Sequence, residues 1–214
     1  MGWMGKQSKV PIKTNIEKLL EIFSRTKRLL NHTYVGFYQY KIELLKETEK
    51  EFAVLKKDTK SLINQFIEIN TKDKEEDKAI KGMISIAVHL DRIVENIESL
   101  IQTTQAMIKD GILFSDKAVK EVSHLYEGLY NKLGNVADLI LTKNEVLIKH
   151  TINNLNLLRK EANQYSTEHE ERLISGVCSP KSTTYYLKMI DSLIEMMRHT
   201  RNIIQIIVAP SYHA

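Results

Sequence analysis

Two acidic side chains, Asp91 and Glu95, lie four positions apart in a stretch rich in apolar residues. Residues at this spacing share one face of a helix, so the two carboxylates would converge as ligands of a hard or borderline cation do. Acidic pairs at this spacing are common in a charged chain, and Glu17 and Glu21 form another. Taken alone, the Asp91/Glu95 pair is typical of a solvated helix face.

Glu121 and His124 have the Glu-x-x-His spacing of di-iron helical bundles. A ferritin-like site needs two such motifs and a further Glu from each of two other helices. The chain carries this motif once, at a frequency that chance explains. A helical carboxylate metalloprotein of ferritin-like type is therefore the alternative interpretation, and the weaker one.

The remaining reactive side chains do not form a catalytic pattern. Cys178 stands in a loop beside Pro180, and the sequence shows neither a base nor a cause for a lowered thiol pKa. Gly-rich phosphate loops, nucleophile elbows and Cys/His metal clusters are missing from the sequence. His169 and Arg172 could bind an anion, but a role in complementing a helix dipole is favoured. We predict that the protein is not an enzyme.

The aromatic and basic residues near the start of the chain could suggest nucleic acid or membrane binding. Tyr34, Phe37 and Tyr38 cluster at helical spacing, which favours core or helix–helix contact over base stacking. Up to Leu30, Lys and Arg outnumber the acidic residues, and such a patch could adhere to anionic lipid. A solvated helix face is favoured over this third option. We therefore expect no nucleic acid and at most peripheral membrane contact.

The composition restricts the fold class. The chain has 214 residues with 8 Gly and 3 Pro, far below the roughly 12% that average usage gives these two residues together. A β-sandwich or barrel needs frequent Gly/Pro turns, and a Rossmann fold needs a Gly-rich first turn. With 43% hydrophobic residues, one Cys and a net charge of +4, we expect an all-α protein located in the cytoplasm. No segment approaches the 18 apolar residues of a membrane span.

Apolar residues recur at helical spacing in six segments. Capping residues set their expected starts, among them the boxes Thr48/Glu51 and Thr142/Glu145 and the cap Asp73. The first helix is expected to run without a break to about residue 46, and the last to begin near Ser182 and to end at Pro210. The six expected helices cover about 14–46, 48–69, 73–110, 115–141, 142–174 and 182–209.

The six helices divide into three and three. Each capping box opens a middle helix, which a polar break and a long apolar helix follow. We interpret this as a duplicated unit: a tail at 1–11, a first three-helix bundle at 12–110 and a second at 111–214. Short connections make successive helices antiparallel.

Three segments resemble the PhoU family of phosphate-uptake regulators, and most closely the PhoU-like cytoplasmic domain of bacterial sodium/phosphate cotransporters. HLDRIVENIE (89–98) is similar to the third-helix pattern of the family. GILFSDKAVKE (111–121) resembles the link into its second repeat. HEERLISGVCS (169–179), with YLKMIDSL (186–193), resembles the end of the fifth helix, its loop and the sixth helix.

The resemblance implies two similar three-helix bundles and a regulatory role in phosphate transport. The implied partners are a membrane phosphate transporter or a phosphate-sensing kinase, and a second copy of the chain as a homodimer. Many members bind iron or zinc through E(D)-x-x-x-D motifs. Asp91 and Glu95 stand at the matching place, and Asp58 is a looser metal-ligand candidate.

The second half departs from this metal motif. The matching pair in the sixth helix is Ile194 and Arg198, which cannot bind a cation, and the expected acids of the fifth helix fall near Asn154 and Asn156. Asn202 keeps the Asn position of the family. Because the second motif is lost, the absence of a cofactor is favoured over iron or zinc at Asp91/Glu95.

Overall fold

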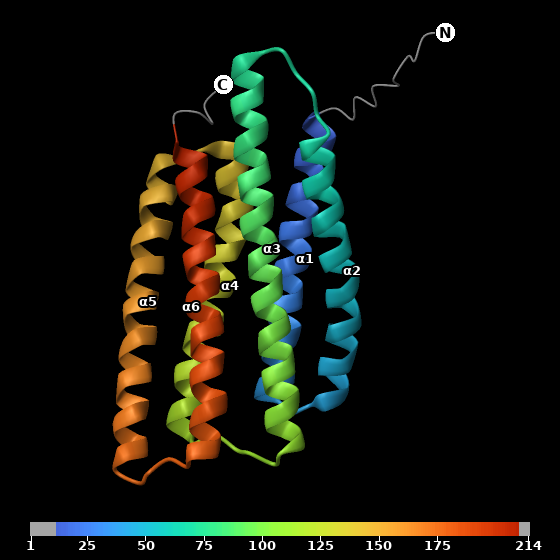
Figure 1. Cartoon of the computed structure of the whole chain (residues 1–214). Helices are drawn as coiled ribbons and strands as arrows, with labels where there is room; N and C mark the ends of the chain where they lie inside the picture. Colours follow the sequence, from blue (N-terminus) through green and yellow to red (C-terminus); the bar gives the residue numbers. More distant parts are fainter. Residues whose placement is uncertain (1–11, 210–214) are drawn as a thin grey trace.

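The computed structural model describes residues 12–209, which form long helices joined by short turns (Figure 1). Among these residues there is no strand, so the all-α prediction is confirmed. The helices are α1 (Ile12–Tyr38), α2 (Ile42–Ile67), α3 (Lys74–Lys109), α4 (Asp116–Thr142), α5 (Glu145–Ile174) and α6 (Pro180–Val208). The predicted tail at 1–11 and the predicted stop at Pro210 lie outside the described residues.

The helices form two three-helix units, α1–α3 and α4–α6, with neighbours antiparallel (Figure 1). Every helix contacts the other two of its own unit, and the units meet through α3 against α6 and α1 against α4. In Figure 1, α2 and α5 lie at the two outer edges, with α3 and α6 between them. We refer to the contact between the units as the seam.

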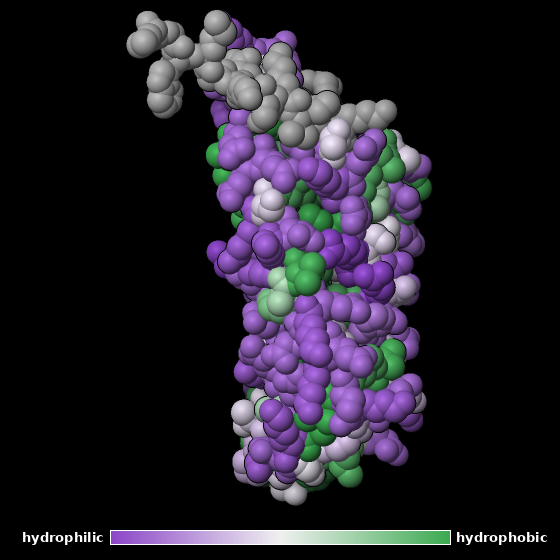
Figure 2. All heavy atoms as spheres, turned by 90° about the vertical axis from the view of Figure 1, so that its right-hand side faces the viewer, coloured by the Kyte–Doolittle hydropathy of each residue, from purple (hydrophilic) through white to green (hydrophobic). Residues whose placement is uncertain are grey.

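The core follows the apolar spacing of the helices that line the seam. On α3, Leu90, Ile93, Val94 and Ile97 are fully buried, and their spacing of three and four residues places them along one stripe. Viewed from the α2 side, the surface is mainly hydrophilic (Figure 2). Within residues 12–209, no helix has the length and apolar character of a membrane-spanning segment.

Several predicted helix ends are confirmed by their capping hydrogen bonds. The carboxylate of Asp73 accepts from the backbone N–H groups of Glu75 and Glu76, and the hydroxyl of Ser115 accepts from that of Ala118. Gly111 adopts a φ of +65° directly after α3, in the left-handed region where a glycine carries no steric cost. The residues of the link between the two units therefore favour the conformation that it adopts.

The first predicted helix is wrong at its end. The chain turns at residues 39–41, and Thr48 is a buried residue inside α2 whose hydroxyl bonds to the carbonyl of Leu44 at 2.7 Å. Tyr40 makes this turn with a φ of +54°. Residues 39–41 include no Gly or Pro, so the sequence does not mark the turn. The tight approach of α2 rests on Gly36, where a Cβ would lie 2.6 Å from Leu45 Cδ2.

Two other predicted starts are displaced. Thr142 is the last residue of α4, and the side chain of Asn144 caps α5 by accepting from Leu147 N–H. The sixth helix begins at Pro180 rather than near Ser182, because Ser179 caps it and Pro occupies its first position. Proline is well suited there, since the first turn of a helix does not need its N–H.

Candidate functional site

The predicted ligand pair Asp91/Glu95 lies on α3 and faces α2, with both carboxylates on one side of the helix. The ammonium of Lys56 on α2 lies between them, 3.2 Å from Asp91 Oδ1 and 2.5 Å from Glu95 Oε1. The side chains of Lys56 and Asp91 are only 16% and 14% exposed. We call Lys56, Asp91 and Glu95 the Lys56 cluster.

The electrostatics of the Lys56 cluster are balanced within the chain. Burial would raise the pKa of the Glu95 carboxyl, but hydrogen bonds from Lys56 and Arg92 outweigh this effect and hold its pKa below the ordinary value. Asp91 Oδ1 accepts no aligned hydrogen bond from the described residues, yet the Lys56 ammonium beside it compensates its charge. Both carboxylates thus already have a cation.

The third candidate, Asp58, does not join this pair. It lies two residues beyond Lys56 on α2, which turns it toward α1, where Arg25 Nη1 contacts its Oδ2 at 2.6 Å. Within residues 12–209, no three His, Cys, Asp or Glu side chains come together as metal ligands. The donors as arranged do not fit a metal ion, since an ammonium occupies the cation position. Metal binding at Asp91, Glu95 and Asp58 stays a prediction.

The corresponding place in the second unit is built from different residues. Arg198 on α6 pairs with Glu195 at 2.6 Å, and its Nη2 lies 2.9 Å from His199 Nε2. The loss of the metal motif in this unit stays a prediction.

A second charged cluster lies inside the α4–α6 unit, and sequence reasoning missed it. Glu121 on α4 is 5% exposed. Its carboxylate accepts two hydrogen bonds from Arg172 on α5, at 3.2 and 2.8 Å. It also accepts one from the hydroxyl of Tyr186 on α6 at 2.6 Å. We call Glu121, Arg172 and Tyr186 the Glu121 cluster; it joins all three helices of its unit.

His169 borders the Glu121 cluster. Its ring stacks on Tyr186, with centroids 3.9 Å apart, and its Nε2 lies 3.1 Å from the Thr183 hydroxyl. Burial, followed by the Arg172 guanidinium, lowers the pKa of His169, while Glu121 acts in the opposite direction. Arg172 lies in the last turn of α5, where a cation complements the helix dipole as the sequence analysis favours, and both side chains also have partners inside the unit.

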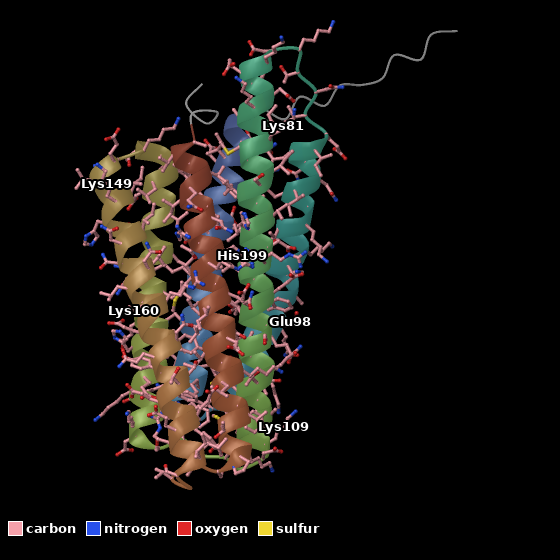
Figure 3. All side chains as sticks on the ribbon, turned by 60° about the vertical axis from the view of Figure 1, so that its left-hand side comes forward. Lys81, Glu98, Lys109, Lys149, Lys160 and His199 are labelled. Carbon is pink, nitrogen blue, oxygen red and sulfur yellow. The ribbon has the colours of Figure 1, made fainter. Side chains whose placement is uncertain are left out.

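A histidine pair lies at the seam. His89 on α3 and His199 on α6 approach with their Nδ1 atoms 2.9 Å apart, and Figure 3 shows His199 midway along the helices. One ring must donate and the other accept. The Nε2 of His199 faces the Arg198 guanidinium at 2.9 Å and must accept from it, so His199 is neutral and donates from its Nδ1 to His89. Burial, Arg198 and the neighbouring His89 lower the pKa of His199 to about 4.

Comparisons with known proteins identify the architecture. No protein-family model matches the chain, and no curated protein matches its sequence. Among solved structures, PhoU from Pseudomonas aeruginosa superposes with a TM-score of 0.80, at 12% identity, over 92% of this chain and 95% of that one. The fold is that of PhoU.

A second structure has a related arrangement. It is a protein from Shewanella oneidensis described as a PhoU-like phosphate regulatory protein, with a TM-score of 0.57, 10% identity, and coverage of 90% of this chain and 96% of that one. At these identities the likeness concerns the fold. The expected duplicated three-helix plan is thereby confirmed as the PhoU arrangement.

The two residues of the Glu-x-x-His motif, Glu121 and His124, make separate contacts. Glu121 belongs to the Glu121 cluster, whereas His124 Nε2 lies 2.9 Å from Glu161 Oε2 on the outside of the unit. The two side chains do not share a centre. The geometry therefore does not favour the ferritin-like alternative.

Three of the early basic residues have partners inside the first unit or across the seam, while Lys6 and Lys9 lie outside the described residues. Lys18 donates to Gln65 Oε1 at 2.8 Å, Arg25 pairs with Asp58, and the Lys27 ammonium lies 4.3 Å from the ring centroid of Tyr130. The solvated helix face and the lipid-binding patch both stay predictions. Tyr34, Phe37 and Tyr38 were expected in the core or in helix–helix contact. Phe37 is buried and Tyr34 contacts the Tyr126 ring of α4 with centroids 5.3 Å apart, but Tyr38 is 63% exposed.

Proposed function

We propose that this protein is a regulatory or accessory protein of phosphate transport, which acts by binding a partner and not by catalysis. The observation that carries the proposal is the PhoU fold, shared with the Pseudomonas aeruginosa protein along nearly the whole of both chains. The three PhoU-like segments support it independently, because they come from the sequence and lie at α3, at the link between the units and at the α5–α6 loop.

The state of the polar side chains supports a binding role. Arg172, Glu121 and His199 each bond to other residues of the chain, so these groups stabilise helix packing. A general acid or base must instead reach a substrate proton. The working surface in this proposal is a face of the bundle.

The partner that we propose is a membrane phosphate transporter or a phosphate-sensing kinase, contacted from the cytoplasm. The likeness of residues 89–98 and 169–179 to the cytoplasmic domain of sodium/phosphate cotransporters favours the transporter. Contact with the membrane would be peripheral and mediated by that partner. A homodimer formed through a helix face is compatible with the same role.

The experiment is deletion of the gene in its host, followed by measurement of radiolabelled phosphate uptake and of partners crosslinked to the tagged chain. We expect altered uptake, restored by the wild-type gene, and a transporter or kinase among the crosslinked proteins. Unchanged uptake together with no such partner would refute the proposal.

A further inference from the structure

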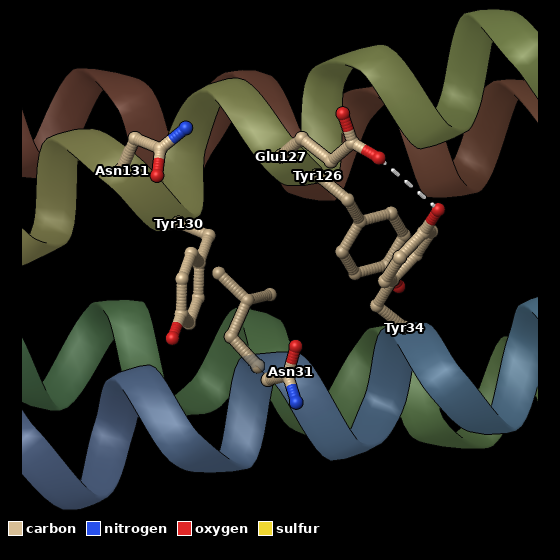
Figure 4. Close-up of a pocket in the computed structure, with 7 residues that line it drawn as sticks. Asn31, Tyr34, Tyr126, Glu127, Tyr130 and Asn131 are labelled. Atoms are coloured by element: carbon tan, nitrogen blue, oxygen red, sulfur yellow. Dashed lines mark hydrogen bonds between the residues drawn. The ribbon is translucent and has the colours of Figure 1, made fainter.

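A slot between α1 and α4 is unused by the proposed function. Its volume is about 340 Å³, within the range of small-molecule sites. It lies at the seam, so one wall comes from each three-helix unit (Figure 4). The lining residues are Leu30, Asn31, Tyr34, Tyr126, Glu127, Tyr130 and Asn131.

The sequence builds this slot through matched spacing on two helices. On α1, Asn31 and Tyr34 are one turn apart, and on α4 Glu127 and Asn131 are one turn apart. Residues three or four positions apart face the same way, so each helix presents an edge of polar and aromatic groups to the other. Figure 4 shows Tyr130 at one end of the slot and Tyr34 with Tyr126 at the other.

The charge of the slot comes from Glu127. Its carboxylate is exposed, and its contact with the Tyr34 hydroxyl is long, at 3.5 Å. With residues 12–209 it forms no ion pair. The slot thus contrasts with the Lys56 and Glu121 clusters, where a side chain of the protein already neutralises each acid.

The aromatic residues of the slot attract cations. Lys27 already places its ammonium 4.3 Å from the Tyr130 ring centroid, an arrangement that reflects the attraction between cations and aromatic faces. Tyr126 is 1% exposed, and its hydroxyl has no hydrogen-bond partner among the described residues. Asn31 and Asn131 bring amide oxygens that accept N–H groups.

We propose that this slot binds a guanidinium group. A guanidinium is planar, stacks on aromatic rings and donates several N–H bonds in a fork that suits a carboxylate. Glu127 would accept this fork, the half-exposed Tyr34 ring would lie against its plane, and the two asparagine amides would accept the remaining N–H groups. The group can be the side chain of an arginine in a protein partner or part of a free guanidinium compound.

The test is a titration followed by NMR of the Asn31 and Asn131 side-chain amides. The probes are capped arginine (N-acetyl-arginine-methylamide), capped citrulline as its neutral analogue, and free L-arginine. We expect capped arginine to shift both amides and capped citrulline to bind at least tenfold more weakly. If L-arginine binds more tightly than capped arginine, the source is a free compound; equal or weaker binding indicates a partner's arginine.

The variants separate recognition from folding. Glu127→Gln removes the charge of an exposed side chain and is expected to weaken capped arginine at least tenfold. Glu170→Gln, an equally conservative change at an exposed position of α5, is expected to leave binding unchanged. Equal binding of capped arginine and capped citrulline, or full affinity in Glu127→Gln, would overturn the proposal. These readouts are independent of phosphate uptake, so failure here leaves the proposed function in place.

Discussion

The two three-helix units use charged residues in opposite ways. In the first unit, Lys56 on the middle helix neutralises two carboxylates of the third helix, one of which, Glu95, is partly exposed. In the second, Arg172 on the middle helix bonds to Glu121 of the first helix in the interior, where Tyr186 completes the cluster. Units with the same plan of helices thus form clusters whose carboxylates differ in exposure, since Glu121 is 6% exposed and Glu95 is 35% exposed.

The difference has an energetic consequence, because the strength of an ion pair depends on its burial. A partly exposed pair contributes at most about 1 kcal/mol, whereas removal of one partner from a buried pair costs about 3–5 kcal/mol. The Glu121 cluster should therefore act as a structural tie of its unit. In the Lys56 cluster the partly exposed Glu95 should contribute less to the free energy of unfolding.

The largest effect is expected from Glu121→Gln. The substitution leaves the Arg172 guanidinium, whose side chain is 14% exposed, without its carboxylate, so the free energy of unfolding should fall by about 3 kcal/mol. Urea unfolding followed by circular dichroism measures this, with Glu170→Gln as the exposed control. A loss as small as that of the control would show that burial does not distinguish the two clusters.

The seam between the units should weaken in acid. The pKa of His199 is about 4, below the ordinary 6.5 that the unfolded chain has, so the unfolded state binds more protons between these values. Stability should therefore fall by about 2 kcal/mol from pH 7 to pH 5. His199→Gln should remove most of this slope in urea unfolding at the two pH values. A slope unchanged by the variant would assign the titration to another group.

Tyr186→Phe sharpens the comparison within the Glu121 cluster. The variant loses the 2.6 Å hydrogen bond to the carboxylate but keeps both bonds from Arg172. A hydrogen bond to a charged group contributes about 1.5 kcal/mol or more, so the loss should lie near this value. Urea unfolding of Glu121→Gln, Tyr186→Phe and the double variant checks it, and additive losses would mean that the two side chains are not coupled.

The smallest effect on stability, about 1 kcal/mol, is expected from Lys56→Met, because Glu95 is 35% exposed and keeps the Arg92 guanidinium at 2.7 Å. The Lys56→Met variant also tests metal binding, because it removes the ammonium from between Asp91 and Glu95. We expect Lys56→Met to bind Zn²⁺ at least about tenfold more tightly than the wild type, a gain of about 1.4 kcal/mol. Lys57→Met, at an exposed position beside it, is the control for calorimetric titration. Equal affinity in all three proteins would contradict the role of Lys56.

Much of the fold could be predicted from the sequence because helices leave local signals. Asp73, Ser115 and Gly111 mark their helix ends through their own conformational preferences, and the structure confirms them. The turn at Tyr40 could not be predicted, because Tyr40 has a left-handed φ and residues other than Gly, Asn and Asp rarely adopt one. Thr48 shows the converse error: a residue suited to a cap can equally bond to the preceding turn from inside a helix.

The charged sites were less predictable because their partners are distant in sequence. The spacing of Asp91 and Glu95 indicates that they share a face, but it says nothing of Lys56 on another helix. Glu121 and Arg172 are 51 residues apart, and neither belongs to a pattern that announces a buried pair. The slot similarly depends on the packing of α1 against α4, which joins edges from different units.

The placement of α1 and α6 has a topological consequence. The start of α1 and the end of α6 lie at the same end of the bundle (Figure 1), and the turn at Gly111 between the units lies at the opposite end. A linker across the first end and a cut at the second would give a circular permutant in which α4–α6 precedes α1–α3. Each unit would remain contiguous, and the helices would retain every neighbour, so the order of the units along the chain is separable from the architecture.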